Sequence, residues 1–244
     1  MSTADKTTVL DGARREIYEY VQREGRTSES DLRSALDFDE TALGHHLTVL
    51  RRHGYLWRSD DEIAVGFGEV PAERHETDEI GYEVRLARAP DRDGLIATIR
   101  AVADAGRYIE AESVADVLEE EGAVLRRSPI RSRLVFVART DGDGVVGWVH
   151  LDLPELEKLR HTAVLTVGVH PEWRGHGIGS TLLERGERWA REHGYERLYN
   201  SVPATNETAV DWLADRGWHE EAVREGHYRI DGEPVDEMMM ATDL

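Results

Sequence analysis

Hydrophobic positions in the first part of the chain recur at helical spacing. A first helix is expected to end at Gly25, a second to begin with the capping box Ser28-x-x-Asp31, and a third to follow the N-cap residue Asp39. The apolar faces of these helices comprise Val9, Leu10, Ala13, Ile17, Tyr20 and Val21, then Leu32, Ala35 and Leu36, then Leu43, Leu47 and Leu50. Because such spacing puts each set on one side of its helix, the pattern predicts three packed helices.

After the third helix the pattern changes to short alternating runs. Residues 55–58 and 62–65 are expected to form a small hairpin, which completes one domain over residues 1–66. Residues 67–80 contain glycine, proline and charge without periodicity, which is typical of a linker. Alternation then resumes, and a second domain is predicted over residues 81–244.

The second domain mixes helical and strand patterns. Helical segments are expected at 95–102, within 107–130 and from Ile178 to Ala190. Strands are expected at 82–86, 132–140, 144–152, 162–170 and 198–202. In the first of these strands, Tyr82, Val84 and Leu86 form the apolar face, with Glu83 and Arg85 on the other. This mixture predicts an α/β domain.

A glycine-rich turn lies between an apolar strand and a helix, in the stretch Val167–Ser180. Gly175, Gly177 and Gly179 leave backbone N–H groups uncovered, and the following helix adds its own unpaired N–H groups and its positive dipole end. Such an arrangement can bind a diphosphate, with Arg174 adding a fixed positive charge. The glycine spacing fits neither the dinucleotide fingerprint nor a Walker loop.

The segment Arg174-x-x-Gly177-x-Gly179, after a V-x-V-x-P strand end, resembles the coenzyme A loop of the GNAT superfamily of N-acetyltransferases. Residues 206–218 resemble the family's helix and turn after a motif asparagine, and residues 231–240 resemble its closing strand. The resemblance covers roughly residues 81–244. It implies a mixed, mainly antiparallel sheet, acetyl-CoA as co-substrate and acetyl transfer to an amine acceptor. The coenzyme A contacts it implies are Val167, Val169, Arg174, Gly175, His176, Gly177, Ile178, Gly179, Ser180 and Asn206.

The resemblance also directs attention to the leaving group and the oxyanion. Family members often protonate the departing thiolate with a tyrosine seven residues after the motif asparagine, a position that is Leu213 here. Because thiol pKa values lie near about 8.5, a thiolate leaves tolerably without such help. The family stabilises the thioester oxygen with a backbone N–H at a strand end, which implies Val169 or its neighbour.

Three residues are candidates for proton transfer. His161 retains the histidine of a His-Thr-x-Glu segment found in phosphinothricin-type members, although Val164 replaces its carboxylate; the alternative is a surface histidine. Glu110 and Glu112 lie where family members place residues that face the substrate. Of the two, Glu112 is the candidate for binding a cationic amine or accepting its proton, or else is a carboxylate favouring a helix N-terminus. Tyr228 is a candidate pocket residue, with aromatic core as the alternative.

Composition narrows the chemistry further. Cysteine is absent, which excludes disulfides, thiolate catalysis and an acetyl-cysteine intermediate, so that direct attack by the amine is expected. His150-x-Asp152 lacks an identifiable third ligand and residues 141–144 form a hairpin turn, so no metal is expected. No stretch is long enough to span a membrane, and a cytoplasmic location is the expectation.

The charge is strongly negative. The net charge is -19, and Lys6 and Lys158 are the two lysines, so arginine supplies most positive charge. This composition favours a halophilic protein in a salt-rich cytoplasm, where repulsion between like charges is screened. An ordinary acidic protein is the alternative.

The N-terminal domain resembles the winged helix-turn-helix of MarR- and ArsR-type repressors over residues 6–66, on the segment Gly44–Leu56. The resemblance implies double-stranded DNA as a partner. The expected contacts come from Arg51, Arg52 and Arg58 to phosphates and from His45 and Thr48 to bases. The acidic Asp39 and Glu40 stand at the helix end that usually enters the groove. A docking module or a homodimerisation module is therefore the alternative.

Together the patterns favour a winged helix fused to an acetyl-CoA-dependent N-acetyltransferase. Two alternatives stay open. One is a transcription regulator whose acetyltransferase domain senses acetyl-CoA with little turnover, and the other is an enzyme whose N-terminal domain binds a protein.

Overall fold

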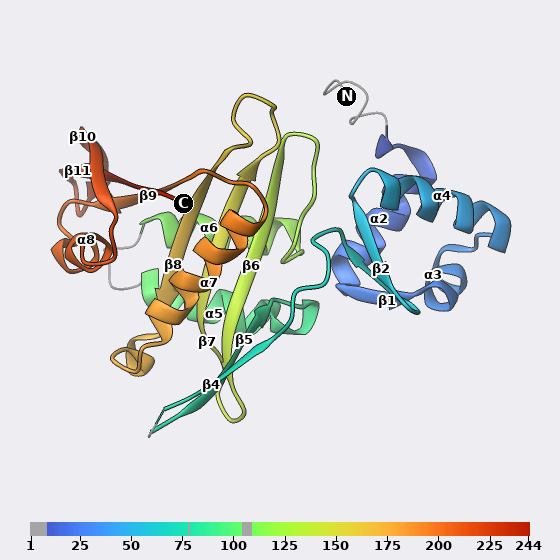
Figure 1. Ribbon diagram of the computed structural model, residues 1–244, viewed down its shortest axis with the longest axis horizontal. Coiled ribbons are helices and arrows are strands. Elements are labelled where there is room, and N and C mark those ends of the chain that lie inside the picture. Colours follow the sequence, from blue (N-terminus) through green and yellow to red (C-terminus); the bar gives the residue numbers. More distant parts are fainter. Residues whose placement is uncertain (1–8, 78, 104–108) are drawn as a thin grey trace.

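The computed structural model describes residues 9–77, 79–103 and 109–244. It contains a small N-terminal part of helices with a short sheet and a larger part built on a long sheet (Figure 1). The chain passes from the first to the second near residue 66, close to the predicted boundary. The domain boundaries themselves stay a prediction.

The N-terminal part follows the expected order of helices and adds one strand. Its elements are α2 (Gly12–Glu24), β1 (Arg26–Ser28), α3 (Glu29–Leu36), α4 (Glu40–Arg52), β2 (Leu56–Ser59) and β3 (Glu62–Val65). The predicted caps are present: Ser28 and Asp31 form the capping box of α3, and the Asp39 side chain accepts a hydrogen bond from the Ala42 N–H.

Two local details in this part differ from the predicted pattern. Helix α2 begins at Gly12, after Leu10, because Asp11 has an extended backbone. Tyr20 packs against the core as expected, but Tyr18 is more deeply buried, because its face of α2 contacts the larger domain. Strand β1, which has three residues, pairs with β3 and makes a sheet of order β1-β3-β2.

Within the described residues of the second part, eight strands form one sheet of order β10-β11-β9-β8-β7-β6-β5-β4. The elements are β4 (Glu73–Glu76), β5 (Gly81–Leu86), α5 (Arg92–Ala103), α6 (Ile109–Glu121), β6 (Arg131–Thr140), β7 (Gly144–Pro154), β8 (Thr162–Val169), α7 (Ile178–Glu192), β9 (Arg197–Pro203), α8 (Glu207–Ala214), β10 (His219–Ile230) and β11 (Glu233–Asp243). Neighbouring strands are antiparallel except β8 and β9, which are parallel. The predicted α/β architecture with a mixed, mainly antiparallel sheet is confirmed.

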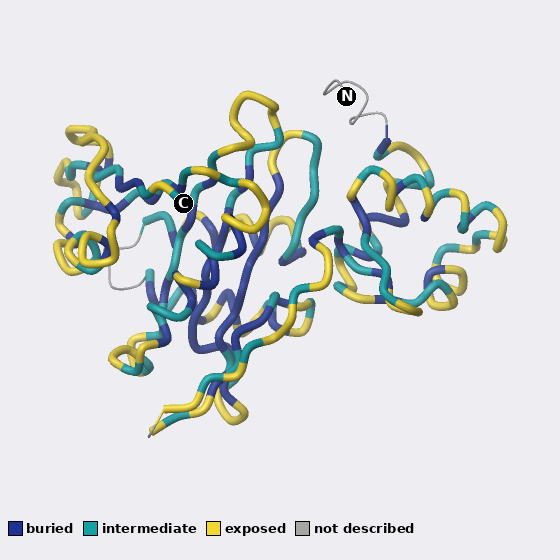
Figure 2. Tube along the Cα trace, in the orientation of Figure 1, coloured by how far each residue is buried: buried dark blue, intermediate teal, exposed yellow. Residues whose placement is uncertain are grey.

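Helices cover both faces of this sheet. Helix α7 lies on one face and helices α5 and α6 on the other (Figure 1). Alternate residues of β6 divide accordingly, with Phe136 in the core of the α7 side and Val135 and Val137 in the core of the α5–α6 side. The central strands are therefore buried throughout (Figure 2).

Part of the expected linker belongs to the sheet. Strand β4 pairs with β5 as the edge strand, and Glu73 forms ion pairs with Arg185 at 2.9 Å and Arg188 at 2.6 Å on helix α7. Arg85, expected on a polar face, is buried because Asp91 binds its guanidinium at 2.6 and 2.9 Å. Both differences depend on ion pairs with residues of another element, which the pattern of apolar and polar positions within one segment does not reveal.

The two parts of the chain are joined by a specific contact. The Tyr18 hydroxyl on α2 donates a hydrogen bond to the Arg127 carbonyl at 2.7 Å and accepts one from the Arg127 N–H at 2.6 Å. The Arg127 guanidinium lies over the Phe67 ring and forms an ion pair with Glu155 at 2.9 Å. Phe67 in turn packs edge-on against Trp189 of α7. The interface thus places the N-terminal part directly on the larger domain.

Tyr18→Phe should destabilise this interface. The variant keeps the ring but leaves the Arg127 N–H and carbonyl without their partner, which costs about 1–3 kcal/mol. Thermal denaturation should show a lower Tm than that of Tyr20→Phe, a control on the same helix whose ring lies beneath Arg23. Equal melting temperatures for the two variants would contradict the importance of this contact.

Candidate functional site

The site begins where strands β8 and β9 separate. The two strands pair at Thr162–Val164 with Arg197–Tyr199 and no further within the described residues. Beyond that point the buried Asn200 side chain donates a hydrogen bond from Nδ2 to the Leu165 carbonyl at 2.7 Å. A side chain thus satisfies a carbonyl that a continuing β9 backbone would have bonded. Asn200 therefore links the two strands at the point where the gap between them begins.

A cavity of about 520 Å³ opens at this gap. Its walls come from β8, the 171–177 loop, the start of α7, β9, α8 and the α5–α6 side. The sequence-predicted residues that line it are Val167, Val169, Arg174, Gly175, Gly177, Ile178, Gly179, Ser180 and Asn206. The structure therefore brings together nine of the ten predicted coenzyme A contacts.

The start of α7 presents backbone donors to this cavity. Gly177 is the N-cap with φ 80°, and no side chain caps the helix. The first helical hydrogen bond runs from the Thr181 N–H to the Gly177 carbonyl, so the N–H groups of Ile178, Gly179 and Ser180 have no partner within the helix. The first turn contains no acidic residue. Such an end attracts an anion.

Two arginines stand at this end of the cavity. Arg174 donates from Nε to the Val169 carbonyl at 3.2 Å, which fixes the side chain beside β8. Arg216 stacks over Trp212 at 4.2 Å and donates to the Ser180 hydroxyl at 2.9 Å. Sequence reasoning missed Arg216, although its spacing of four from Trp212 on a predicted helix was an available signal. Together they give this end of the cavity two fixed positive charges.

The β8 backbone offers donors to the gap as well. The His170 N–H bonds the Val146 carbonyl, so in this antiparallel pair alternate residues Val167 and Val169 direct their N–H groups away from β7. Because β9 has separated, these groups face the cavity that both residues line. They are suited to a developing negative charge on oxygen.

The α8 side of the cavity is apolar where a proton donor was considered. Leu213 is 2% exposed and lines the cavity. Asn206 also lines it, and its side chain caps α8 by accepting a hydrogen bond from the Ala209 N–H at 3.3 Å. Both roles foreseen for Asn206 are compatible with this position.

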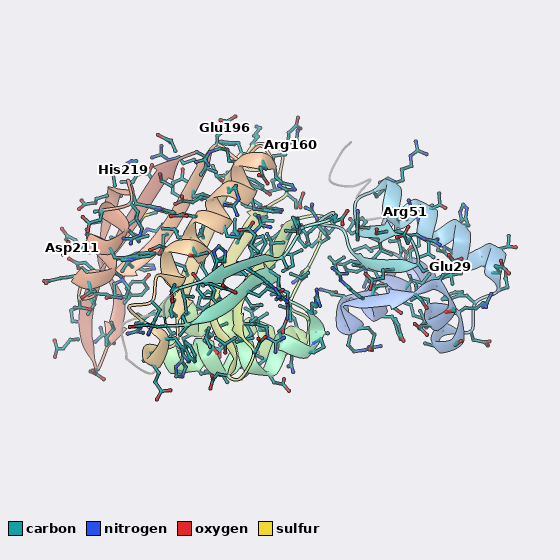
Figure 3. The ribbon with its side chains drawn as sticks, turned by 60° about the horizontal axis from the view of Figure 1, so that its bottom comes forward. Glu29, Arg51, Arg160, Glu196, Asp211 and His219 are labelled. Atoms are coloured by element: carbon teal, nitrogen blue, oxygen red, sulfur yellow. The ribbon has the colours of Figure 1, made fainter. Side chains whose placement is uncertain are left out.

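None of the three proton-transfer candidates lines the cavity. His161 is exposed at the beginning of β8, whereas the cavity lies at the end of that strand; seven residues of strand span roughly 23 Å. Its carbonyl accepts a hydrogen bond from the Glu196 N–H, and Figure 3 shows Glu196 beside Arg160 at this edge. His161 is thus at the surface and away from the cavity, which favours the surface alternative; its role as a base stays a prediction that this position does not support.

Glu112 is also exposed and does not line the cavity. Helix α6 turns Glu110 inward instead, because the two residues stand about 200° apart on a helix. Glu110 therefore replaces Glu112 as the candidate carboxylate.

Glu110 belongs to a small acidic cluster with Tyr228 and Glu237. The Tyr228 hydroxyl donates to Glu110 Oε1 at 3.4 Å. Burial, reinforced by the charge of Glu237, raises the pKa of Glu110, and burial beside these two carboxylates raises the pKa of Tyr228. Tyr228 is buried and supports Glu110 from behind rather than lining the cavity itself.

Other sequence candidates have different surroundings. His176 does not line the cavity; its Nε2 lies 3.1 Å from the Glu79 carboxylate. Burial lowers the pKa of His150 to about 3, with Arg133 contributing, so it is a neutral core histidine. No group of three or more potential ligands that could hold a metal occurs in the described ranges. None of the helices described there is long and apolar enough to cross a membrane.

A second candidate surface lies on the N-terminal part. Thr48, Arg51, Arg52 and Arg58 line one shallow groove between α4 and β2. Arg51 and Arg52 are exposed, whereas Arg58 forms an ion pair with Glu29 at 2.8 Å; Figure 3 labels Glu29 and Arg51 on this part. His45 is exposed on the same helix. The groove thus brings the three predicted arginines together, and Glu29 compensates the charge of one of them, Arg58.

Comparison with known proteins shows which family the larger domain is similar to. Residues 103–218 match the model of the Acetyltransferase (GNAT) family. The amino-acid acetyltransferase of Mannheimia succiniciproducens is 28% identical over 139 residues, which cover 56% of this chain and 27% of that protein. The chain thus spans about a quarter of the length of this curated relative.

Solved structures show the same fold. A GNAT-family acetyltransferase from Streptococcus pneumoniae has a TM-score of 0.55 at 22% identity, over 67% of this chain and 99% of its own. A Salmonella typhimurium protein solved with its cofactor acetyl-CoA has a TM-score of 0.52 at 20% identity, over 66% of this chain and 92% of its own. Acetyl-CoA is the co-substrate typical of the family, and residues 103–218 of this chain are an acetyltransferase domain of the GNAT family.

Proposed function

We propose that this protein transfers the acetyl group of acetyl-CoA to an amine. The observation that carries the proposal is one cavity combining unpaired N–H groups at the start of α7 with the separated strands β8 and β9. The helix start and the arginines Arg174 and Arg216 suit the phosphates of coenzyme A. The gap between the strands suits its extended pantetheine arm, beside Asn206.

The chemistry follows from the groups that line the cavity. The amine attacks the thioester carbonyl carbon, the new C–N bond forms, and the C–S bond breaks to release a thiolate. The N–H groups of Val167 and Val169 are suited to stabilise the charge on the carbonyl oxygen. Glu110 is suited to receive the proton that the amine loses, since its raised pKa makes it a stronger base.

The leaving thiolate has no donor at the position of Leu213. We infer that it leaves as the anion and takes its proton from water, which the thiol pKa of about 8.5 allows. If departure of the unprotonated thiolate is slow, turnover is low. This is the basis of the rival function, in which the domain senses acetyl-CoA without useful turnover.

A thiol-release assay separates these functions. Acetyl-CoA is incubated with the full chain and panels of small amines, peptides and antibiotics at high salt, and free coenzyme A is measured. Amine-dependent release above the hydrolysis rate is expected. Tight acetyl-CoA binding without release on any panel would favour the sensor, and failure to bind acetyl-CoA would overturn both.

We further propose that the N-terminal part is a winged helix-turn-helix that binds DNA. The order of helix, strand, two helices and two strands, with all three strands in one sheet, supports this assignment. The groove that gathers Arg51, Arg52 and Arg58 is the specific feature in its favour. These side chains suit phosphates, and His45 and Thr48 on the exposed face of α4 suit base edges.

The triple variant Arg51→Ala, Arg52→Ala, Arg58→Ala should weaken DNA binding on all sequences alike. Each lost phosphate contact should lower the salt slope of binding by roughly one. The measurement is a mobility-shift series on the promoter of its own gene at several KCl concentrations. Arg33→Ala, a control on α3 that removes an arginine outside the groove, should bind as the parent does. If the triple variant binds equally well, DNA binding through this groove is wrong.

A further inference from the structure

We propose that the acceptor is a cationic amine that carries no carboxylate, and that its ammonium group binds at Glu110. This inference rests on the proposed acetyl transfer and names the chemical class of its acceptor. It commits to an acceptor different from the amino acids in the printed name of the Mannheimia relative.

Positive and negative side chains line different walls of the cavity. Among its described lining residues the cations are Arg174, from the loop before α7, and Arg216, which follows α8. The carboxylate among them is Glu110, on α6. The charges that shift the pKa of Glu110 are those of Glu237 and His227, and neither arginine is among them. The wall with the arginines is therefore suited to the phosphates of acetyl-CoA, and the wall with Glu110 to a positive charge.

A second carboxylate adds negative charge beside Glu110. Glu237 on β11 is 2% exposed, and its own charge is compensated by Arg224 at 2.9 Å and by His227 at 3.5 Å when that imidazole is protonated. Glu110 forms no direct ion pair within the described ranges; its hydrogen-bond donor there is the neutral Tyr228 hydroxyl, and a protonated His227 acts on it only through space. The charge of Glu110 is thus the less compensated of the two, and it is the one that lines the cavity.

Because Glu110 is partly buried, a bound positive charge would stabilise its carboxylate more than it would an exposed one. Its raised pKa reflects the cost of keeping a charge near Glu237 in a partly buried place. An ammonium group removes that cost, whereas a carboxylate on the acceptor would add a third negative charge. The neighbouring wall residues Val102 and Ile109 are apolar and suit an aliphatic chain.

The test compares three aliphatic amines of similar size: putrescine, butylamine and γ-aminobutyrate. Thiol release gives kcat/KM for each with the full chain. Putrescine and butylamine are expected to exceed γ-aminobutyrate at least tenfold. Glu110→Gln should lower kcat/KM for putrescine and butylamine at least tenfold, and so reduce the preference for these two amines over γ-aminobutyrate. Its affinity for acetyl-CoA, measured by calorimetry, should be unchanged. Glu112→Gln, an exposed neighbour on α6, should behave as the parent.

Each outcome bears on a distinct claim. Equal use of γ-aminobutyrate, or an unchanged preference in Glu110→Gln, overturns the cationic acceptor while leaving acetyl transfer intact. Tyr228→Phe keeps the ring and tests the cluster without altering a charge; it should reduce the preference less than Glu110→Gln does. Bound acetyl-CoA with no release for any of the three amines or any acceptor in the wider panels overturns the proposed function, and this inference with it.

Discussion

Gly177→Asp is expected to weaken acetyl-CoA binding at least tenfold, which corresponds to about 1.4 kcal/mol. The new carboxylate would stand at the uncapped start of α7, where the backbone donors are suited to a diphosphate. A Cβ at Gly177 meets nothing within 4 Å, so the effect comes from charge rather than from a clash. Calorimetric titration in molar KCl measures the dissociation constant.

Gly177→Asn is the matched control for this variant. Asparagine has nearly the same size as aspartate and tolerates the positive φ of 80° at this position, but carries no charge. It should retain most of the affinity. An affinity in Gly177→Asp equal to that of the parent, in a folded protein, would contradict the assignment of the loop to the diphosphate.

Leu213→Tyr is expected to raise kcat by up to ~10²-fold, the contribution of a general acid. The side chain lines the cavity, so a phenol there would reach the space in which the thiolate leaves. The fold should persist, because the hydrogen bond from the Trp218 N–H uses the backbone carbonyl of residue 213. The thiol-release rate at saturating acceptor measures the gain.

Leu213→Phe separates proton donation from bulk. It adds a ring of similar size without a hydroxyl and should give no gain in kcat. A similar loss of activity in both variants would show that residue 213 packs against acetyl-CoA or the acceptor, and that protonation of the thiolate does not limit the rate.

The sequence was most informative where a pattern was long or its chemistry was local. Strands β6, β7 and β8 have eight to eleven residues, so their long apolar runs could be recognised in the sequence. The glycine loop carries its function in its own backbone, and most of its predicted contacts meet in one cavity. Strand β1 has three residues, and β4 has four that are all polar, so neither shows an apolar pattern that would predict a strand.

Residues whose roles depend on tertiary contacts were harder to predict. Glu110 and Glu112 are equivalent in sequence, and the packing of α6 decides which of them faces the cavity. Arg216 joins the site because α8 folds back towards Ser180 at the start of α7. His161 matched a motif, but β8 carries it to the far end of the strand. Adaptation to high salt stays a prediction, because the contacts within the protein do not reveal the salt concentration of its surroundings.

The central claim is that the cavity between β8 and β9 carries acetyl transfer from acetyl-CoA to an amine. Acetyl-CoA labelled with ¹³C at the acetyl carbonyl, mixed with the full chain and putrescine, tests it by NMR. The thioester signal should disappear and an amide signal of N-acetylputrescine should replace it, in parallel with free thiol. Label that stays in the thioester, or that appears only as acetate, with putrescine and with every acceptor of the wider panels would contradict the account.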